Sequence, residues 1–409
     1  MSVQIVLTAD NHLDPPAVRF GSKRYERKMD FLRCFEHVCE YALKEKPDLF
    51  LVAGDLFDHI LPRNPTRARV MKLFKELYEK GVKIFLISGH HDTPKNVEQG
   101  SSPLATFGNS GYTVFFQDPS KIESYTMSIN GLRVVVSGLS YDPTLPYDQD
   151  PLEDKRIPIN NDINVFMLHY PIVGFEGYIG YEPTVHPEFI PKGIHLLACG
   201  HFHKYQESVI NDVYTVYPGS TERVTFKEES EDKGFVWLEI DREGVIAKDF
   251  IKTPARPMRT IDFTVSEKED LDEQLIAFLD SFEDKNLILR LRLKGVIDVA
   301  RLSTYRRTNV LYHAQDKFFT LLIEEEDLEI ETEEVMEPLP RTTPLEEVRR
   351  YFQALISKAK EQERAVILEA QRLCESKLQE AGAWSDSPAY TSPTLNASTL
   401  RKRFPYLKE

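Results

Sequence analysis

The sequence predicts an α/β fold with a buried parallel sheet, on two observations. Short, continuously apolar runs such as residues 3–9 and 49–53 indicate strands that are covered on both faces. Stretches with apolar residues at helical spacing separate these runs, as in residues 25–46 and 66–80. Because ligands of such sheets gather beyond the carboxyl ends of the strands, the residues that follow each run are the first candidates for a functional site.

The elements follow one another at regular intervals along the first 253 residues. A third strand is expected over residues 82–88, and a loop rich in Gly, Ser, Pro and Asn follows it over residues 93–110. Further strands are expected at residues 112–117, 132–137, 163–168 and 194–199, and antiparallel strands within 213–251. We therefore assign residues 1–253 to one domain.

Two prolines, Pro254 and Pro257, mark a second domain over residues 254–335. A strand at 259–265, a helix at 270–282 and strands at 287–293 and 318–323 predict a small α+β unit. Residues 336–383 then form a linker and one long amphipathic helix over 345–381, and the tail, residues 384–409, is expected to be disordered.

The length, the cysteine content and the net charge of the chain limit its number of domains, its location and its partners. At 409 residues, two or three domains are expected. No run approaches 18 apolar residues, the N-terminus has no basic leader, and the four cysteines form no CxxC pair, so we expect a cytoplasmic protein with no membrane span. The net charge of −14 argues against broad electrostatic binding to nucleic acid, and it permits a polyanionic substrate without indicating one.

Potential metal ligands recur at the ends of the predicted strands. Six of the eleven histidines and two aspartates fall there: Asp10, His12, Asp55, His90, His91, His169, His201 and His203. Mixed imidazole and carboxylate ligands suit manganese, iron or zinc better than magnesium or calcium. Because eight residues exceed the ligands of one ion, two metals that share a carboxylate are expected. Two ions roughly 3.5–4 Å apart clamp both oxygens of an in-line phosphoryl displacement.

These residues also form an ordered set of motifs. Asp10-x-His12, Gly54-Asp55, Gly89-x-His91-Asp92, His169 and Gly200-His201-x-His203 resemble the five blocks of the calcineurin-like metallophosphoesterases. Within that superfamily the chain resembles the SbcD nuclease subunits of SbcC-SbcD DNA repair complexes, through GDLFD, YPGSTER, KGFVWLEI and RPM. The resemblance covers roughly residues 1–330. It implies a β-sandwich flanked by helices, a small α+β capping domain that binds DNA and a C-terminal helix that binds a partner.

The resemblance also implies a role for each site residue. Asp55 would bridge two divalent ions, with Mn²⁺ expected, and His91 would act as general acid at the leaving oxygen. Independently of the resemblance, Asp92 is predicted to cap a turn or a helix rather than to act in catalysis. The remaining ligands would be Asp10, His12 and His203 for one ion, and His169, His201 and His90 for the other. Position 90 departs from the family pattern, which has asparagine there, so His90 either remains a ligand or weakens the second site.

The implied function is that of a manganese-dependent DNA nuclease, with double-strand exonuclease and single-strand endonuclease activity, in double-strand break repair. An SbcC-type SMC-like ATPase would dock on the helix whose apolar residues run from Leu345 to Leu373, unless that helix packs on the capping domain. A homodimer is implied, located at the nucleoid if the source is prokaryotic. Arg301, Arg306 and Arg307 either contact phosphates or form a solvated face. The alternatives are a DNA-end-binding scaffold attenuated by His90 and a phosphodiesterase with a non-DNA substrate.

Overall fold

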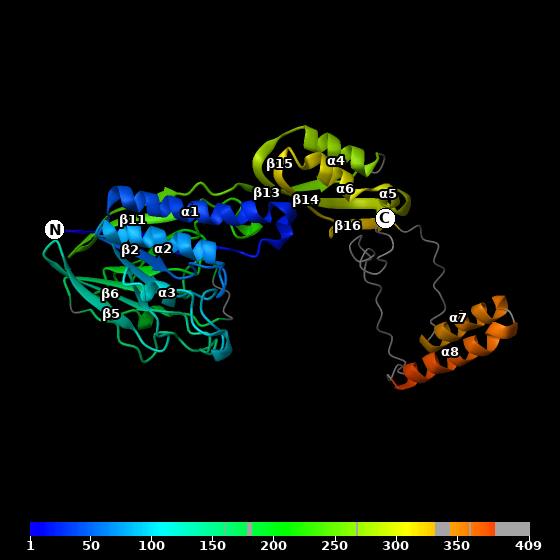
Figure 1. Cartoon of the computed structure of the whole chain (residues 1–409), viewed down its shortest axis with the longest axis horizontal. Coiled ribbons are helices and arrows are strands. Elements are labelled where there is room, and N and C mark those ends of the chain that lie inside the picture. The colour runs from blue at the N-terminus through cyan, green and yellow to red at the C-terminus, as the bar shows by residue number, and fades with distance from the viewer. Residues whose placement is uncertain (160, 178–181, 267–268, 332–343, 360, 381–409) are drawn as a thin grey trace. The chain divides into compact units, whose positions relative to one another are not determined.

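Two six-stranded mixed sheets lie within residues 3–252 of the chain (Figure 1). The computed structural model describes residues 1–409 except 160, 178–181, 267–268, 332–343, 360 and 381–409. The first sheet has the order β12-β11-β1-β2-β3-β4, and β1 to β4 are parallel. β11 pairs antiparallel with β1, and β12 pairs antiparallel with β11. Its strands are β1 (Val3–Thr8), β2 (Leu49–Ala53), β3 (Lys83–Ile87), β4 (Thr113–Phe116), β11 (Gly234–Asp241) and β12 (Gly244–Lys252).

The second sheet has the order β5-β6-β7-β8-β10-β9. The four inner strands are parallel to one another, and the two edge strands are antiparallel to their neighbours. Its strands are β5 (Glu123–Ile129), β6 (Leu132–Leu139), β7 (Ile163–Leu168), β8 (Leu196–Cys199), β9 (Gln206–Ile210) and β10 (Val213–Tyr217). The parallel strands predicted from the apolar runs are confirmed in both sheets.

Alternate residues of these strands fill the space between the sheets. Leu7 and Leu51 of the first sheet belong to the same buried cluster as Val134 and Val165 of the second. The two sheets therefore form a sandwich, as expected from their alternation of inward-facing side chains.

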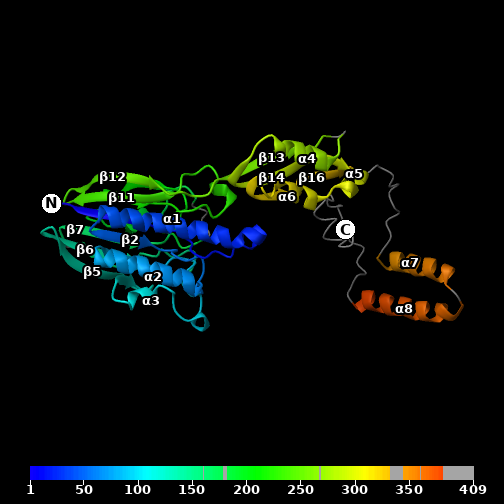
Figure 2. The ribbon, with the colours of Figure 1, turned by 45° about the horizontal axis from the view of Figure 1, so that its top comes forward.

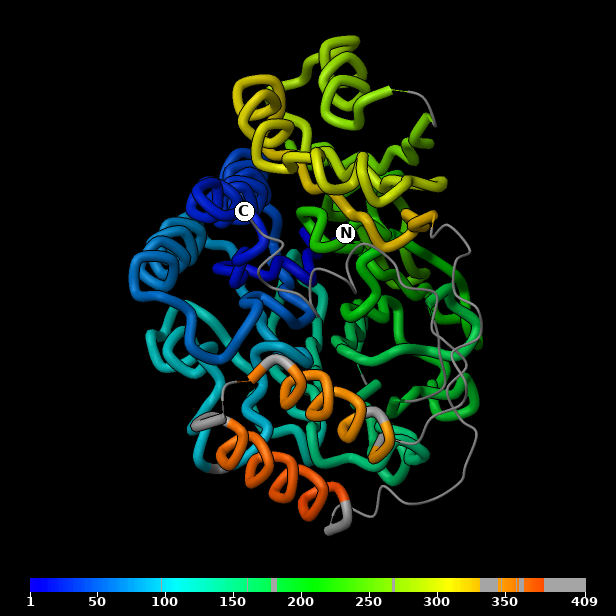
Figure 3. Tube along the Cα trace, turned by 90° about the vertical axis from the view of Figure 1, so that its right-hand side faces the viewer, coloured from blue at the N-terminus to red at the C-terminus, as the bar shows by residue number. Residues whose placement is uncertain are grey.

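Helices cover the outer face of the first sheet. On that face Phe50 contacts Phe74 of α2 (Asn64–Glu79), which in turn packs against Phe35 of α1 (Arg24–Glu45). Figures 2 and 3 show the blue coils of α1 and α2 side by side along this sheet. On the second sheet the outer face is covered by residues of the connecting segments, such as Tyr170 and Val185. Short helices complete this region: η1 (Val18–Lys23), η2 (Val97–Gln99), α3 (Ala105–Gly108), η3 (Pro187–Phe189) and η4 (Phe226–Glu228).

A smaller α+β region follows β12, with elements in the predicted order. A sheet of order β13-β14-β15, with β16 paired to β14, is combined with three helices. The elements are β13 (Met258–Thr264), α4 (Leu271–Asp280), β14 (Asp284–Asp298), α5 (Val299–Thr304), α6 (Arg307–Ala314), β15 (Phe318–Glu324) and β16 (Leu328–Glu331).

The chain forms two compact units, and the boundary between them lies after residue 261, later than the predicted boundary at residue 253. The first unit runs to Ile261 and includes residues 282–290 and 313–322, and the second comprises the remaining residues from Asp262. A buried ion pair explains why the segment after β12 belongs to the first unit. Arg256 binds both carboxylate oxygens of Asp30 in α1, at 2.6 and 2.8 Å, and its main-chain N donates to Glu222.

The prediction of one long helix over residues 345–381 was wrong, because the structure has two helices there. They are α7 (Pro344–Lys358) and α8 (Glu361–Glu380), and Arg349 of α7 pairs with Glu375 of α8 at 3.2 Å. No glycine or proline marks the break in the sequence. The predicted linker over residues 336–343 and the predicted tail over 384–409 lie outside the described residues. Among the described helices, none has the length and apolar composition needed to cross a bilayer.

Phe35→Ala tests the packing of α1 on the first sheet. Phe35 is fully buried against Phe74, so its truncation should lower the free energy of unfolding of the first unit by about 3–5 kcal/mol. Tyr25→Ala is the control on the same helix, because Tyr25 is 64% exposed, and it should change stability by less than about 0.5 kcal/mol. Guanidinium unfolding followed by circular dichroism measures both. Equal effects of the two substitutions would contradict this packing.

Candidate metal centre

The candidate ligands come from the carboxyl ends of five strands in the two sheets. Asp10 and His12 follow β1, and Asp55 follows β2 after Gly54. His90 and His91 follow β3, His169 follows β7, and His201 and His203 follow β8. Because the two sheets are packed together, side chains at these ends meet although they lie far apart in the sequence.

The backbone at these strand ends adopts a conformation that most residues avoid. Asp10, His12 and Asp55 have φ angles of 49°, 44° and 49°, in the left-handed region. Main-chain hydrogen bonds hold them there, since Asp10 N donates to Gly54 O at 3.1 Å and His12 N to Asp55 O at 3.0 Å. Such strain is found where the surrounding structure fixes a functional geometry.

Two glycines allow the strand ends to approach each other closely. A Cβ atom on Gly200 would lie 2.0 Å from Ala53 O and 2.7 Å from His169 Nδ1. A Cβ atom on Gly89 would lie 2.3 Å from Asp55 Oδ1. Only glycine fits at these two positions, which gives a physical reason for the glycine that precedes the ligand in each motif.

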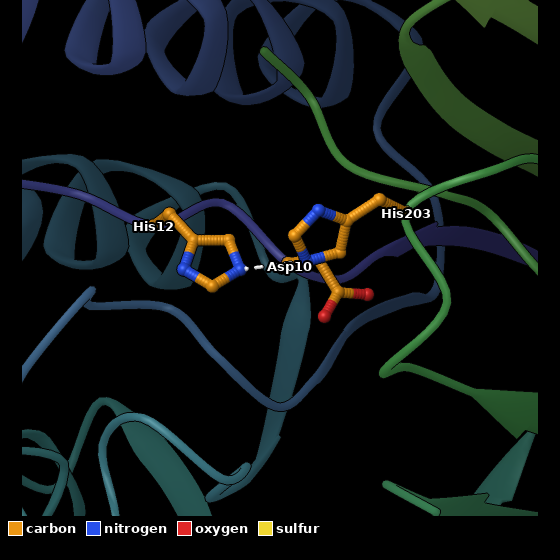
Figure 4. A group of neighbouring side chains, drawn as sticks. All are labelled: Asp10, His12 and His203. Carbon is orange, nitrogen blue, oxygen red and sulfur yellow. Dashed lines mark hydrogen bonds between the residues drawn. The ribbon is translucent and has the colours of Figure 1, made fainter. Parts of the chain in front are cut away.

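The first group of potential ligands is Asp10, His12 and His203 (Figure 4). Figure 4 shows the two imidazoles facing each other beside the Asp10 carboxylate. The Nε2 atoms of His12 and His203 are 3.0 Å apart. His12 is completely buried, and the 3.0 Å separation leaves no room for a water molecule between the rings.

The outer nitrogens of these two rings are already engaged. Nδ1 of His12 lies 3.0 Å from Asp58 Oδ1, and Nδ1 of His203 lies 3.2 Å from Glu228 Oε1. An ionised carboxylate only accepts hydrogen bonds, so each Nδ1 carries a hydrogen, and in the neutral rings each Nε2 presents a lone pair. Two lone pairs facing at 3.0 Å require a shared proton or cation. The donors present therefore fit a divalent ion.

The second group is Asp10, Asp55 and His169. Nδ1 of His169 donates to Ala53 O at 2.8 Å, which leaves Nε2 as the acceptor nitrogen. This Nε2 is buried 3.2 Å from Asp55 Oδ2 and has no hydrogen-bond partner among the described residues. A buried nitrogen without a hydrogen-bond partner, beside two carboxylates, fits a site that holds either a proton or a metal ion. Asp55 reappears in a third group with His12 and His91, and Asp10 belongs to both the first and the second group, so both carboxylates are shared between ligand groups.

Opposing effects set the protonation of these groups. Burial alone would lower the pKa of His12, but the hydrogen bond to Asp58 and the charge of Asp55 raise the pKa to about 9. Burial is likewise outweighed at His169, where the charge of Asp55 raises the pKa to about 10. Although burial opposes it, the same interaction with His169 holds the pKa of Asp55 well below its usual range. In the absence of an ion, protons thus balance the carboxylates.

His91 lies at the exposed edge of the centre. Its main-chain N donates to Asp55 Oδ1 at 2.7 Å, and its Nδ1 lies 3.0 Å from Asp58 O. The ring is 4.7 Å from that of His12, measured between centroids. A carbonyl oxygen only accepts, so Nε2 of His91 is the nitrogen that remains for a substrate.

Two predicted ligands are outside the three groups. The ring of His90 is half-buried and packs edge-on against Tyr141 at 5.3 Å, and burial lowers the pKa of His90 to about 4. His201 lies 5.6 Å from the ring of His169, and its Nε2 is 3.1 Å from Glu182 Oε2. The structure therefore brings Asp10, His12, Asp55, His91, His169 and His203 into ligand groups and leaves His90 and His201 beside them.

The sequence analysis missed the acidic residues behind the ligands. Glu228 was detectable, because Thr225-x-x-Glu228 is a capping-box pattern and the structure contains that capping box. No sequence signal identified Glu182. Asp92 does hold a turn, as predicted: its carboxylate accepts from Gly89 N at 2.7 Å and from Leu56 N at 2.9 Å.

Comparison with known proteins assigns the family. The calcineurin-like phosphoesterase model matches residues 3–205. The DNA double-strand break repair protein Mre11 of Methanopyrus kandleri is 27% identical over 60% of this chain and 55% of its own length. Mre11 of Methanocaldococcus jannaschii is 26% identical over 66% of this chain and 72% of its own, and the SbcD component of the SbcCD nuclease from Staphylococcus epidermidis is 25% identical over 72% and 79%. Through residues 3–205 the chain belongs to the calcineurin-like phosphoesterases and is related to the Mre11 and SbcD proteins.

Proposed function

We propose that the chain is a manganese-dependent DNA nuclease that hydrolyses phosphodiester bonds with two divalent ions. The observation that carries the proposal is the pair of imidazole Nε2 atoms of His12 and His203, which face each other at 3.0 Å beside Asp10. The shared carboxylate of Asp55 supports a second ion next to the first. Imidazole with carboxylate is a donor set that suits manganese.

The proposed ligands form two sets, one for each ion, and each set contains residues from both sheets. Asp10, His12, Asp55 and His203 would hold one ion, and Asp55, His169 and His201, with His90 at the edge, would hold the other. When bound, the two ions supply a hydroxide nucleophile at neutral pH and neutralise the charge on the phosphate. Asp58 and Glu228 orient the rings of His12 and His203 by accepting their Nδ1 hydrogens.

His91 is the proposed general acid. Its Nδ1 is held by Asp58 O, so a proton on Nε2 points toward the exposed side, where the leaving oxygen of a bound phosphodiester would lie. The hydrogen bond from its main-chain N to Asp55 Oδ1 holds the His91 backbone next to the ligand groups. His91 itself would then remain free of metal.

DNA is proposed as the substrate because the relatives are a DNA double-strand break repair protein and a nuclease subunit. An SMC-like ATPase is proposed as the partner on the family resemblance. The helices α7 and α8 support this partner, because they expose the apolar side chains of Tyr351, Val366 and Leu373. A homodimer is proposed on the family resemblance alone. Arg301 does not support DNA binding, since it donates to Ser266 O at 2.6 Å and also to Glu269 O within its own unit.

A second candidate function is favoured by the position of His90. Its ring packs on Tyr141 rather than joining Asp55 and His169 in a ligand group. A weakened second site would leave a protein that binds DNA ends as a scaffold and cuts them poorly. The two candidates differ in cleavage rate.

Asp55→Asn tests the shared carboxylate. Because Asp55 belongs to two ligand groups, its loss should weaken both Mn²⁺ sites by at least about 100-fold. Asp148→Asn is the matched control, since it makes the same change in charge at an exposed position. Isothermal titration of the metal-stripped chain with Mn²⁺ measures both. Loss of only one of two sites would show that Asp55 does not bridge.

Cleavage of an end-labelled DNA duplex tests His91 and His90 together. His91→Ala should slow cleavage by about 10²–10⁴-fold with Mn²⁺ affinity unchanged, because only proton transfer is lost. His90→Asn should cut at least as fast as the parent chain. An inert parent with an active His90→Asn variant would identify the scaffold instead. Hydrolysis of a chromogenic phosphodiester with no cleavage of DNA by any variant would argue for a non-DNA substrate.

Mn²⁺ affinity should rise with pH. The pKa values of His12, about 9, and His169, about 10, mean that both imidazoles are protonated at pH 7 and must release a proton to bind metal. Each released proton should increase the affinity by up to about tenfold per pH unit between pH 6 and 9. Titration calorimetry in buffers of different ionisation enthalpy counts these protons. Binding without proton release would contradict the assignment of these two residues as ligands.

A further inference from the structure

Three imidazoles of the candidate centre are held in the same way. In His12, His203 and His169 one ring nitrogen, Nδ1, contacts a fixed acceptor at 3.0, 3.2 and 2.8 Å. In each ring the other nitrogen, Nε2, lies close to another candidate ligand: Nε2 of His12 and of His203 are 3.0 Å apart, and Nε2 of His169 is 3.2 Å from Asp55 Oδ2. One nitrogen thus fixes the ring and its tautomer, and the other remains for the ion.

His201 has an acceptor of the same kind, but on its other nitrogen. Nε2 of His201 lies 3.1 Å from Glu182 Oε2, and the two side chains are only 16% and 25% exposed. The main-chain N of His201 donates to both carboxylate oxygens of Asp10, at 3.1 and 3.0 Å. The residue is therefore fixed next to the ligand groups through its backbone and through Nε2.

We propose that Glu182 is a positioning residue for the second ion. Its carboxylate accepts the Nε2 hydrogen of His201, selects that tautomer, and leaves Nδ1 as the nitrogen that binds metal. The inference rests on the two-metal function proposed above and names a residue outside the five motifs.

The backbone around Glu182 is anchored well enough for this role. Thr184, which is 5% exposed, donates its hydroxyl to Glu182 O at 2.8 Å. The next residue, Val185, is fully buried and exchanges main-chain hydrogen bonds with Pro171 and Val173, at 2.9 and 3.0 Å. Pro171 and Val173 closely follow His169, so Glu182 is tied to the same strand end that supplies a ligand.

Mn²⁺ titration of the full chain tests the proposal with two substitutions of Glu182. Glu182→Ala should raise the dissociation constant of the second ion by about 10–100-fold and leave the first unchanged. Glu182→Gln should stay within about fivefold of the parent chain, because its amide oxygen accepts the same hydrogen. Glu176→Ala is the control: Glu176 is a 74% exposed carboxylate paired with Lys204 nearby in the chain, and its loss should have no effect.

The tautomer of His201 gives a readout that does not depend on activity or on bound metal. In the metal-free chain labelled with ¹⁵N-histidine, long-range ¹H–¹⁵N spectra should show the Nε2–H form of His201 in the parent and in Glu182→Gln. Glu182→Ala should show a mixture of tautomers. The signals that disappear from the spectrum of His201→Gln identify the ring nitrogens of His201.

Two results would overturn the proposal. One is an unchanged His201 tautomer in Glu182→Ala, and the other is an equal loss of Mn²⁺ affinity in Glu182→Ala and Glu182→Gln. A parent chain that binds fewer than two Mn²⁺ ions refutes the two-metal function instead. The tautomer spectra then decide the role of Glu182 independently.

Discussion

The close contact between the ends of β2 and β8 is the constraint on which the centre depends. Gly200 approaches Ala53 O so nearly that a methyl group would lie 2.0 Å from it. The same carbonyl accepts from His169 of the second sheet, and two residues later the first sheet supplies Asp55. Carboxylates from one sheet can meet imidazoles from the other only because the apolar core between the sheets holds their edges together.

Buried charges hold the segment between β10 and β11 against this centre. Lys233, 2% exposed, donates to His203 O at 2.9 Å and pairs with Glu228 at 2.8 Å. Glu228 in turn holds the ring of His203, so one lysine supports the ligand through both its backbone and its acidic partner. Removing one member of such a buried pair leaves an uncompensated charge, which destabilises a protein by about 3–5 kcal/mol.

The sequence predicted which residues gather at the candidate centre better than it predicted their surroundings. Asp10, Asp55 and His169 were expected to lie together because each follows an apolar run, and strand ends converge in any parallel sheet. The pairing of β7 and β8 in a second sheet was not predictable, since periodicity within a strand does not name its neighbours. β5 was missed because its exposed residues, such as Tyr125, give it no buried run. Glu182 and Glu228 act across long separations in the chain, and the position of the His90 ring depends on Tyr141, 51 residues away.

The four imidazole acceptors differ in how easily mutation could remove them. Asp58, Glu228 and Glu182 act through side chains, so a single codon change abolishes each contact. His169 relies on the main-chain carbonyl of Ala53, which every amino acid supplies. The hydrogen bond that holds His169, the imidazole beside Asp55, is therefore insensitive to substitution at position 53. Sequence divergence in relatives of this chain should accumulate at the three acidic positions before it reaches the geometry of His169.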